Sequence, residues 1–314
     1  MLDAAMPRWQ EACRDAGAVL IGGGQLLSDA DLNFPLKIAR AARLARDAGL
    51  PVAVHAAGVS RNWSPAGRAL FSGLFSTDLR AVGLRDTPSI AAWTAQTGGR
   101  PPAPVLARDP GLLAAECYGP APRRAGWVGV CVTDPAILGY HAEGAVAGAG
   151  AGFYDGLVRA LAARGRRVLL FCNGAEEDRR ALAALAGPLA DLVARGQVEL
   201  APSPDLPAAL AHLIGGLDGL VAHRLHACIL GYAYGRPVVG LGWDRKVESF
   251  FASVGAGRFC LTDPSVTPTA AATRLTEACE AGISAPDLAR ALAEARQAVA
   301  DALAACGITP PGGS

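Results

Sequence analysis

One arginine and two histidines directly follow a short apolar run in the second half of the chain. The run covers residues 220–222, and His223, Arg224 and His226 come immediately after it. A buried strand needs no polar side chain at its end, so these residues are candidates for chemistry. Arginine binds carboxylates and phosphates through its planar fork, and histidine exchanges protons near neutral pH. The corner therefore predicts an anionic ligand and a proton transfer.

The residues around this corner predict a strand, a helix and a second strand. Apolar side chains recur at helical spacing over residues 225–232, and Gly235 and Pro237 favour the end of that helix. Residues 238–241 then return to an apolar run. In such a βαβ unit the helix starts at the carboxyl end of the first strand, and open α/β sheets bind ligands at that edge. We expect the corner to lie there.

Three consecutive glycines follow a predicted strand in the first half of the chain. Residues 18–21 are mostly apolar and lead into Gly22, Gly23 and Gly24. Glycine allows backbone N–H groups to approach a ligand closely, so the triplet is a candidate for binding phosphate or sugar oxygens. It fits neither the dinucleotide-binding pattern nor the P-loop pattern. A plain turn is the alternative interpretation.

Two other predicted strands carry polar residues near their carboxyl ends. His55 interrupts the apolar run of residues 51–57, where it is either a core histidine or a ligand contact. Arg85 and Asp86 close the run of residues 81–84, where they form either a surface ion pair or part of a binding site. Because parallel strands share one carboxyl edge, His55 and Arg85 are candidate substrate-binding residues.

Composition argues against several classes of protein. The net charge of +1 gives no support for nucleic acid as a partner. No apolar run reaches the ~18 residues of a membrane span, and the first residues lack the order of a signal peptide. The eight cysteines include no C-x-x-C pair and no Cys/His cluster, so we expect reduced thiols and no metal site. These features predict a cytoplasmic protein.

The order of the predicted elements divides the chain into two α/β series. We expect a first Rossmann-like domain over residues 1–120 and a second over residues 127–262, separated by the turn-rich residues 117–126. Helices over residues 263–306 would pack back, and the tail of residues 307–314 would be disordered. Two Rossmann-like domains facing a cleft form the architecture of the GT-B class.

Several motifs together resemble the polysaccharide pyruvyl transferase family. They are the glycine-triplet strand, the stretch Gly-Leu-Arg-Asp-Thr-Pro-Ser at 83–89, Asp109-Pro110 and the stretch Val-Ala-His-Arg-Leu-His-Ala at 221–227. Gly235-Arg-Pro-Val-Val239 and Asp244-Arg-Lys246 also fit the family's pattern. The resemblance covers residues 15–262. The glycine triplet and the Arg-Leu-His-Ala corner are fairly specific in combination, and neither is specific alone.

The chain departs from the family at its beginning. Family members usually carry a longer stretch, with a further strand, before the glycine-triplet strand, and here residues 1–17 precede it. We therefore expect a short first domain, with part of the cleft missing or supplied by a partner chain. A homo-oligomer is one way to supply it.

The resemblance implies transfer of the pyruvyl group of phosphoenolpyruvate to two hydroxyls of a saccharide, which forms a ketal. The donor carries a carboxylate and a phosphate, so its site needs at least two cationic anchors. We expect Arg224 and Arg85 to be these anchors, with Lys246 as a weaker third. Gly22 to Gly24 and His55 would contact substrate. The reaction requires no metal and no cofactor.

The same reaction needs a proton at the methylene carbon of the donor and a base for the attacking hydroxyl. We expect His226 to be the acid, and His55 to be either the base or an acceptor contact. A helix N-terminus and a neighbouring arginine disfavour a charged histidine, whereas a bound phosphate favours it. His226 should therefore deliver its proton chiefly when the donor is bound.

Three alternatives stay open at this point. The chain could be a nucleotide-sugar glycosyltransferase or epimerase of the same architecture, although such sites usually place carboxylate, Ser or Gly where this chain has Arg-Leu-His. It could be a non-catalytic family member. It could also act on a small metabolite instead of a polysaccharide. Stabilisation by phosphoenolpyruvate or by UDP would separate the first alternative from pyruvyl transfer.

Overall fold

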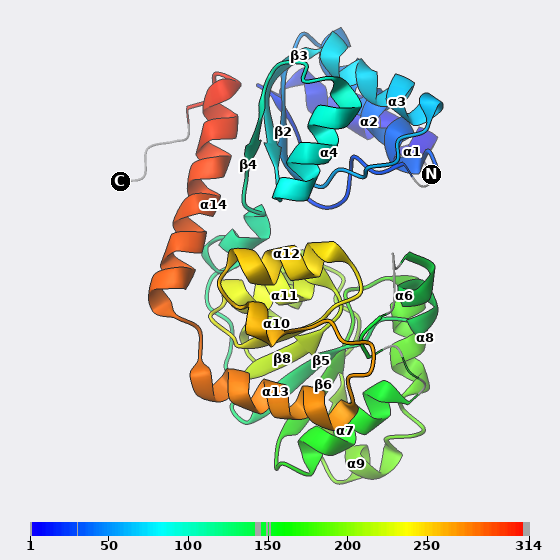
Figure 1. Cartoon of the computed structure of the whole chain (residues 1–314), viewed down its shortest axis with the longest axis vertical. Coiled ribbons are helices and arrows are strands. Elements are labelled where there is room, and N and C mark those ends of the chain that lie inside the picture. Colours follow the sequence, from blue (N-terminus) through cyan, green and yellow to red (C-terminus); the bar gives the residue numbers. More distant parts are fainter. Residues whose placement is uncertain (1, 30, 142–145, 149, 151, 310–314) are drawn as a thin grey trace. The chain divides into compact units, whose positions relative to one another are not determined.

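The chain folds into two compact α/β units. The first unit contains the described residues of Met1–Pro110 and Ala293–Ser314, and the second contains those of Gly111–Leu292. Each unit has one parallel sheet, so the expected α/β class with two Rossmann-like domains is confirmed (Figure 1). The computed structural model describes residues 2–29, 31–141, 146–148, 150 and 152–309.

The chain passes from the first unit to the second before it reaches the predicted linker. The units meet along the chain between Pro110 and Gly111, and the turn-rich residues 117–126 belong to the second unit. Residues 263–306 divide between the two units, since the boundary at Ala293 lies within the last helix. Residues 310–314 of the predicted tail lie outside the described residues.

The first unit is built on a four-stranded sheet whose order follows the sequence, β1-β2-β3-β4. Its elements are α1 (Leu2–Arg14), β1 (Val19–Gly22), α2 (Asn33–Asp47), β2 (Pro51–Ala57), α3 (Pro65–Phe71), the 3₁₀ helix η1 (Ser72–Ser76), β3 (Asp78–Leu84), α4 (Thr87–Thr97), β4 (Pro104–Leu106) and the end of α14 (Ala285–Ala305). Crossovers between parallel strands are right-handed, so connecting helices that follow an unreversed order share one face of the sheet. Figure 1 shows α14 on the opposite face.

Strand β2 shows how the first sheet is buried on both faces. Side chains of a strand alternate between its two faces. Val52 and Val54 belong to the core beneath α2, whereas Ala53 packs with Ala302 of α14 and with Cys306, which follows that helix. A strand covered on both sides reads as an unbroken apolar run, which is the pattern that predicted it.

The second unit has a six-stranded parallel sheet of order β10-β9-β8-β5-β6-β7. Its elements are the 3₁₀ helix η2 (Pro110–Leu113), which begins at the unit boundary, α5 (Ala114–Tyr118), β5 (Trp127–Cys131), α6 (Pro135–His141), α7 (Phe153–Ala162), β6 (Arg167–Phe171), α8 (Glu176–Ala184), α9 (Ala190–Ala194), β7 (Val198–Leu200), α10 (Pro207–Gly215), β8 (Gly219–Ala222), α11 (Leu225–Ala233), β9 (Val238–Leu241), α12 (Arg245–Ser253), the 3₁₀ helix η3 (Gly257–Phe259), β10 (Cys260–Leu261), α13 (Pro268–Ala281) and the start of α14. Numbered within the unit, this is the doubly wound order 3-2-1-4-5-6, which reverses between β5 and β8.

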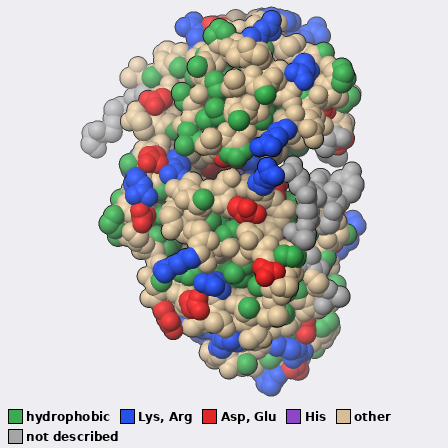
Figure 2. Space-filling view, viewed as in Figure 1, with side chains coloured by type: hydrophobic (Ala, Val, Ile, Leu, Met, Phe, Trp, Pro, Cys, Tyr) green, Lys and Arg blue, Asp and Glu red, His purple; other side chains and the backbone are tan. Residues whose placement is uncertain are grey.

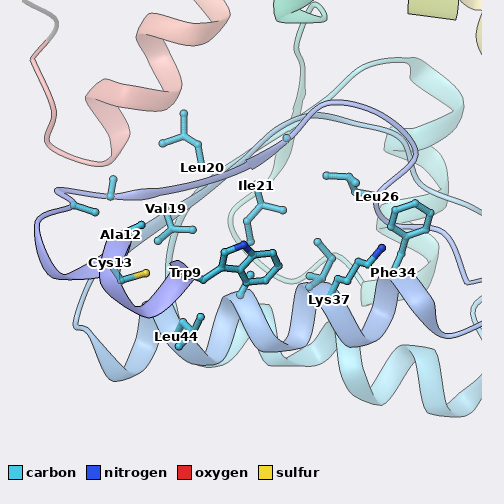
Figure 3. A pocket seen from close by; sticks show the side chains of 15 residues that line it. Trp9, Ala12, Cys13, Val19, Leu20, Ile21, Leu26, Phe34, Lys37 and Leu44 are labelled. Carbon is cyan, nitrogen blue, oxygen red and sulfur yellow. The ribbon is translucent and has the colours of Figure 1, made fainter. Parts of the chain in front are cut away.

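An apolar cavity of about 630 Å³ lies in the first unit between α1, β1 and α2. Figure 3 shows Trp9 of α1 reaching between β1 and α2, with Lys37 of α2 nearby. The lining also includes Gly22, the first glycine of the triplet. Strand β1 is an edge strand, and Leu20 at its centre is 41% exposed. Helix α1 therefore lies beside the edge strand and leaves an apolar cavity between them.

Acidic and basic side chains are interspersed over the face drawn in Figure 2. Elsewhere on the described surface, exposed acidic and basic side chains form pairs, such as Arg159 with Asp191 and Arg124 with Glu199. Such exposed pairs contribute little stability. Within the described part of the chain, no helix has the length and apolar character needed to cross a membrane.

Candidate active site

The predicted corner lies where the strand order of the second sheet reverses. Open α/β sheets bind ligands at this switch point, outside the carboxyl ends of the strands. Strands β5 and β8 pair there, with Cys131 opposite Ala222. Asp134 follows β5 and Arg224 follows β8, so two polar segments leave the sheet side by side.

Arg224 is held by a carboxylate that is fully buried. Its Nε donates to Oδ2 of Asp178 at 2.8 Å, and Nη2 donates to Oδ1 at 2.8 Å. The side chain of Asp178 has 0% exposure, and its Oδ1 also accepts the backbone N–H of Asp134 at 3.0 Å. This two-point contact fixes the plane of the guanidinium group. Arg224 keeps 23% of its side chain exposed, so its remaining N–H groups can face a ligand.

Two opposing effects act on the charge of Arg224. Burial would lower the pKa of its guanidinium group, but the hydrogen bonds and attraction from Asp178 raise it above its ordinary value. Removing one member of a buried pair leaves the charge of the other uncompensated. Asp178 is therefore needed to hold a charged Arg224 in this partly buried position.

Sequence analysis did not identify Asp178 as a site residue. Asp178 lies in the first turn of α8 beside Glu176 and Glu177, where acidic residues favour a helix N-terminus. Asp178 and Leu182, four residues apart, are the buried residues of this helix. An acidic residue on the apolar face of a helix was therefore the signal that could have found it.

His226 lies in the first turn of α11 with an exposed side chain. Arg224 precedes the helix in an extended conformation and makes no side-chain capping bond. Leu225, Cys228 and Ile229 are buried and set the rotation of the helix. That rotation leaves the side chain of His226 exposed, and its role as a proton donor stays a prediction.

Lys246 is connected to this corner through Trp243. Its Nζ lies 2.7 Å from Oδ2 of Asp244 and 4.5 Å from the centre of the Trp243 ring. The indole N–H of Trp243 donates to the backbone carbonyl of His223 at 2.8 Å. The second unit therefore holds Arg224, His226 and Lys246 at the starts of α11 and α12, the helices that follow the neighbouring strands β8 and β9.

The backbone conformation of the loop itself accounts for the three glycines. A Cβ at Gly22 would collide with the backbone carbonyl of His55, so Gly22 permits the close approach of β1 to β2. Gly23 and Gly24 have φ of 74° and 76°, which disfavours other residues. The N–H of Gly23 donates to the carbonyl of His55 at 3.1 Å, and the carbonyl of Gly24 accepts from Gly58. The N–H of Gly23 is therefore used within the protein, which limits the expected role of the triplet as an anion cradle.

Arg85 is also committed to protein partners. Its Nε donates to Oδ2 of Asp86 at 3.2 Å, and Nη2 donates to the side-chain oxygen of Gln25. Gly58 makes room for this contact, because a Cβ there would collide with both Gln25 and Arg85. Arg85 is only 10% exposed. Asp86 in turn caps α4 by accepting the N–H of Ser89 at 2.7 Å.

His55 lies on the face of the first sheet that α14 covers. With Arg108 and Glu294 it lines a cavity of about 440 Å³, and its ring Nε2 is buried without a hydrogen-bond partner. Burial lowers the pKa of His55, which the charge of Asp109 partly offsets. The next residue, Ala56, has φ of 51° at an irregularity of the strand. This left-handed residue beside His55 was not predicted from the sequence, since alanine rarely adopts it.

The candidate residues thus form two groups, one in each unit. Arg224, His226 and Lys246 belong to the second, whereas the glycine triplet, His55 and Arg85 belong to the first. A shared ligand between Arg85 and Arg224 stays a prediction. Among the described residues, no group of three or more His, Cys, Asp or Glu side chains could hold a metal ion.

The family model for polysaccharide pyruvyl transferase matches residues 4–245, more than two thirds of the chain. The chain belongs to this family. The match includes the glycine triplet, Arg85 and the Arg224 corner, and it ends one residue before Lys246. No curated protein matches the chain.

Solved structures support the fold class at low sequence identity. UDP-GlcNAc 2-epimerase from Methanocaldococcus jannaschii has a TM-score of 0.56 at 9% identity, over 94% of this chain and 80% of its own. The Neisseria meningitidis enzyme bound to UDP-GlcNAc gives 0.55 at 14%, over 97% and 82%. Anabaena HepE in complex with UDP and glucose gives 0.54 at 15%, over 96% and 82%. These likenesses confirm the GT-B-like fold and carry no further conclusion about activity.

Proposed function

We propose that the protein transfers the pyruvyl group of phosphoenolpyruvate to hydroxyls of a saccharide-type acceptor. The family membership supports a pyruvyl transferase. The observation that carries the choice of donor is the clamped arginine at the switch point, with Arg224 oriented by the buried Asp178 and partly exposed. A fixed guanidinium fork suits a ligand that presents a carboxylate and a phosphate.

Each residue of the corner has a role in this proposal. Arg224 binds one anionic group of the donor with the N–H groups that Asp178 leaves available. Lys246 supplies a second positive charge, and Asp244 and Trp243 hold its position. Arg85 is the proposed anchor from the first unit. His226 delivers the proton.

The chemistry needs one acid and one base and no cofactor. Proton transfer from His226 to the methylene carbon turns it into a methyl group and makes the adjacent carbon electrophilic. A first acceptor hydroxyl adds to that carbon, and the C–O bond to phosphate then breaks. The second hydroxyl adds to complete the ketal. One hydroxyl proton restores the acid and the other leaves with inorganic phosphate, so atoms and charge balance.

Phosphate release from phosphoenolpyruvate in the presence of a saccharide diol tests the proposal. His226→Ala should lower kcat by about 10²–10⁴-fold, because a positioned acid is lost. Donor binding should stay within about tenfold, or ~1.4 kcal/mol. His212→Ala is the matched control, since His212 lies in the same unit on α10 and bonds to the carbonyl of Tyr118. Equal turnover in both variants would remove His226 from the mechanism.

Thermal shift separates this proposal from a nucleotide-sugar enzyme. Phosphoenolpyruvate should raise the melting temperature, and Arg224→Lys should abolish that rise, because lysine cannot reproduce the two-point contact with Asp178. Stabilisation by UDP and not by phosphoenolpyruvate would overturn the proposal. Donor binding without phosphate release, across a panel of diols, would favour a non-catalytic family member.

A further inference from the structure

His223 belongs to the predicted corner without a role of its own in the proposed reaction, yet it is a point of contact for three segments of the second unit. It follows β8 directly, precedes Arg224 in the sequence and is fully buried. Its Nε2 lies 2.7 Å from the carbonyl oxygen of Ala147, and its Nδ1 lies 2.9 Å from the hydroxyl of Tyr154. A carbonyl can only accept, so Nε2 carries the proton and Nδ1 accepts the Tyr154 hydroxyl.

The hydroxyl of Tyr154 continues this chain of hydrogen bonds to the end of β5. It accepts the backbone N–H of Thr133 at 2.9 Å while donating to His223. Burial raises the pKa of Tyr154 and lowers that of His223 to about 4, so both stay neutral near pH 7. These uncharged, hydrogen-bonded side chains therefore connect the residues that follow β5 to those that follow β8.

A second set of bonds joins His223 to the end of β9. The backbone N–H of Ala147 donates to the carbonyl of Gly242 at 3.0 Å, and the indole N–H of Trp243 donates to the carbonyl of His223 at 2.8 Å. Together with the bond from His223 to Ala147, these contacts close a ring. Lys246 lies over the Trp243 indole, so this closed ring of hydrogen bonds determines where the charge of Lys246 is held.

We propose that His223 is a positioning residue that fixes Arg224 and Lys246 relative to each other. Arg224 follows it directly in the chain, and Lys246 is tied to it through Trp243. This inference rests on the proposed function, since it assumes that both cations bind one donor molecule. An aliphatic side chain would fill the same space, but it would break both ring-nitrogen bonds. His223 acts through its neighbours and does not touch the donor.

Substitutions at His223 test the proposal with a conservative rescue. His223→Met removes both bonds, and His223→Gln can again donate to Ala147 and accept from Tyr154. Loss of the fixed geometry should raise KM for phosphoenolpyruvate by about tenfold in His223→Met, and His223→Gln should stay within about threefold of the parent. Both are assayed well below their melting temperatures, and kcat should change less than KM.

Tyr154→Phe provides a second route in case His223→Met does not fold. It removes the donor to Nδ1 and the acceptor for Thr133, and it should raise KM in the same direction. Tyr232→Phe is the matched control, because it deletes the hydroxyl of another buried tyrosine of this unit, directed at the carbonyl of Val254. KM values equal to the parent in both folded Tyr154→Phe and folded His223→Met would overturn the proposal.

Exchange of the Trp243 indole proton, followed by NMR, gives a readout that needs no donor. It should quicken in His223→Met and Tyr154→Phe and stay slow in His223→Gln and Tyr232→Phe. A parent protein that neither binds phosphoenolpyruvate nor releases phosphate would end the proposed function and leave indole exchange as the test of the ring. Unchanged exchange in His223→Met would overturn the positioning role, whatever the activity.

Discussion

The two sheets of the molecule are alike in being parallel and differ in strand order. The first runs β1-β2-β3-β4 without reversal, whereas the second reverses between β5 and β8. A reversal sends the connections on either side of it to opposite faces and leaves a gap at the strand ends. The second sheet therefore offers an open corner with Arg224 beside it. In the first sheet, the loops at the strand ends are bonded to one another, and Arg85 is already enclosed among them.

The two arginines show the same difference in their contacts. Arg224 shares Asp178 with a single backbone N–H, and both of its bonds to that carboxylate are 2.8 Å long. Arg85 shares Asp86 with the first turn of α4, and its bond to that residue is 3.2 Å long. The two-point contact with a fully buried carboxylate orients the charge of Arg224, whereas the single contact of Arg85 with a carboxylate that also caps α4 mainly closes a loop. Substitutions at the two aspartates test this distinction.

Asp178→Ala should be the most damaging substitution of the set. It leaves Arg224 without its counter-charge and the N–H of Asp134 without an acceptor, and breaking a buried pair costs about 3–5 kcal/mol. Urea unfolding, with hydrogen exchange read from peptides of the second unit, measures the loss. Asp178→Asn keeps the shape and one acceptor, so it should lose less. A loss below about 1 kcal/mol in Asp178→Ala would show that the pair is no more than a surface contact.

The buried histidines of the two units should respond differently to acid. The pKa of His223 is about 4 in the folded protein against 6.5 ordinarily, so between these values the unfolded chain binds more protons. Stability should therefore fall as pH drops from 6.5 to 4, by 2.5 units at 1.36 kcal/mol each, or about 3 kcal/mol. Burial also lowers the pKa of His55, and an aspartate opposes the shift in both cases, Asp109 for His55 and Asp178 for His223, but His55 keeps 5% of its surface exposed whereas His223 keeps none. The first unit should therefore lose less stability than the second over this pH range.

His223→Gln isolates the contribution of His223 to acid sensitivity. Glutamine does not titrate, so the variant should lose less stability than the parent between pH 6.5 and pH 4. Hydrogen exchange of peptides from each unit, recorded across that range, gives the comparison. Identical pH profiles for the parent and the variant would mean that other groups control the acid response.

Sequence analysis located the strands better than the contacts between them. Residues 51–57 and 238–241 are strands with the predicted limits, because buried parallel strands are continuous apolar runs. The corner at Arg224 was also predicted, since polar residues at a strand end interrupt that pattern. Asp178 and Tyr154 were not, because they lie 46 and 69 residues from their partners in sequence. Only the strand order brings them together.

Asp86→Ala should have a moderate effect confined to the first unit. It removes the cap of α4 and one of two side-chain partners of Arg85, and the loss of such a cap costs about 1–2 kcal/mol. Gln25 still holds Arg85, so the side chain should stay near its place. Unfolding measured beside Asp178→Ala makes the comparison direct. A loss as large as that of Asp178→Ala would mean that the two arginines are held equivalently.

Gly24→Ala should give the smallest effect and decides what the triplet is for. Among the described residues, no atom beyond the two chain neighbours lies within 4 Å of a Cβ placed there, so the cost is the left-handed conformation, about 1 kcal/mol. Gly24→Asn should lose less, since asparagine adopts this conformation more readily. If the triplet only shapes the loop, both variants should keep the parent's affinity for phosphoenolpyruvate, measured by calorimetry. If its backbone contacts the donor, affinity should fall about tenfold in both, because any Cβ obstructs the approach. The second result would add the backbone of the triplet to Arg85 as a proposed donor contact of the first unit.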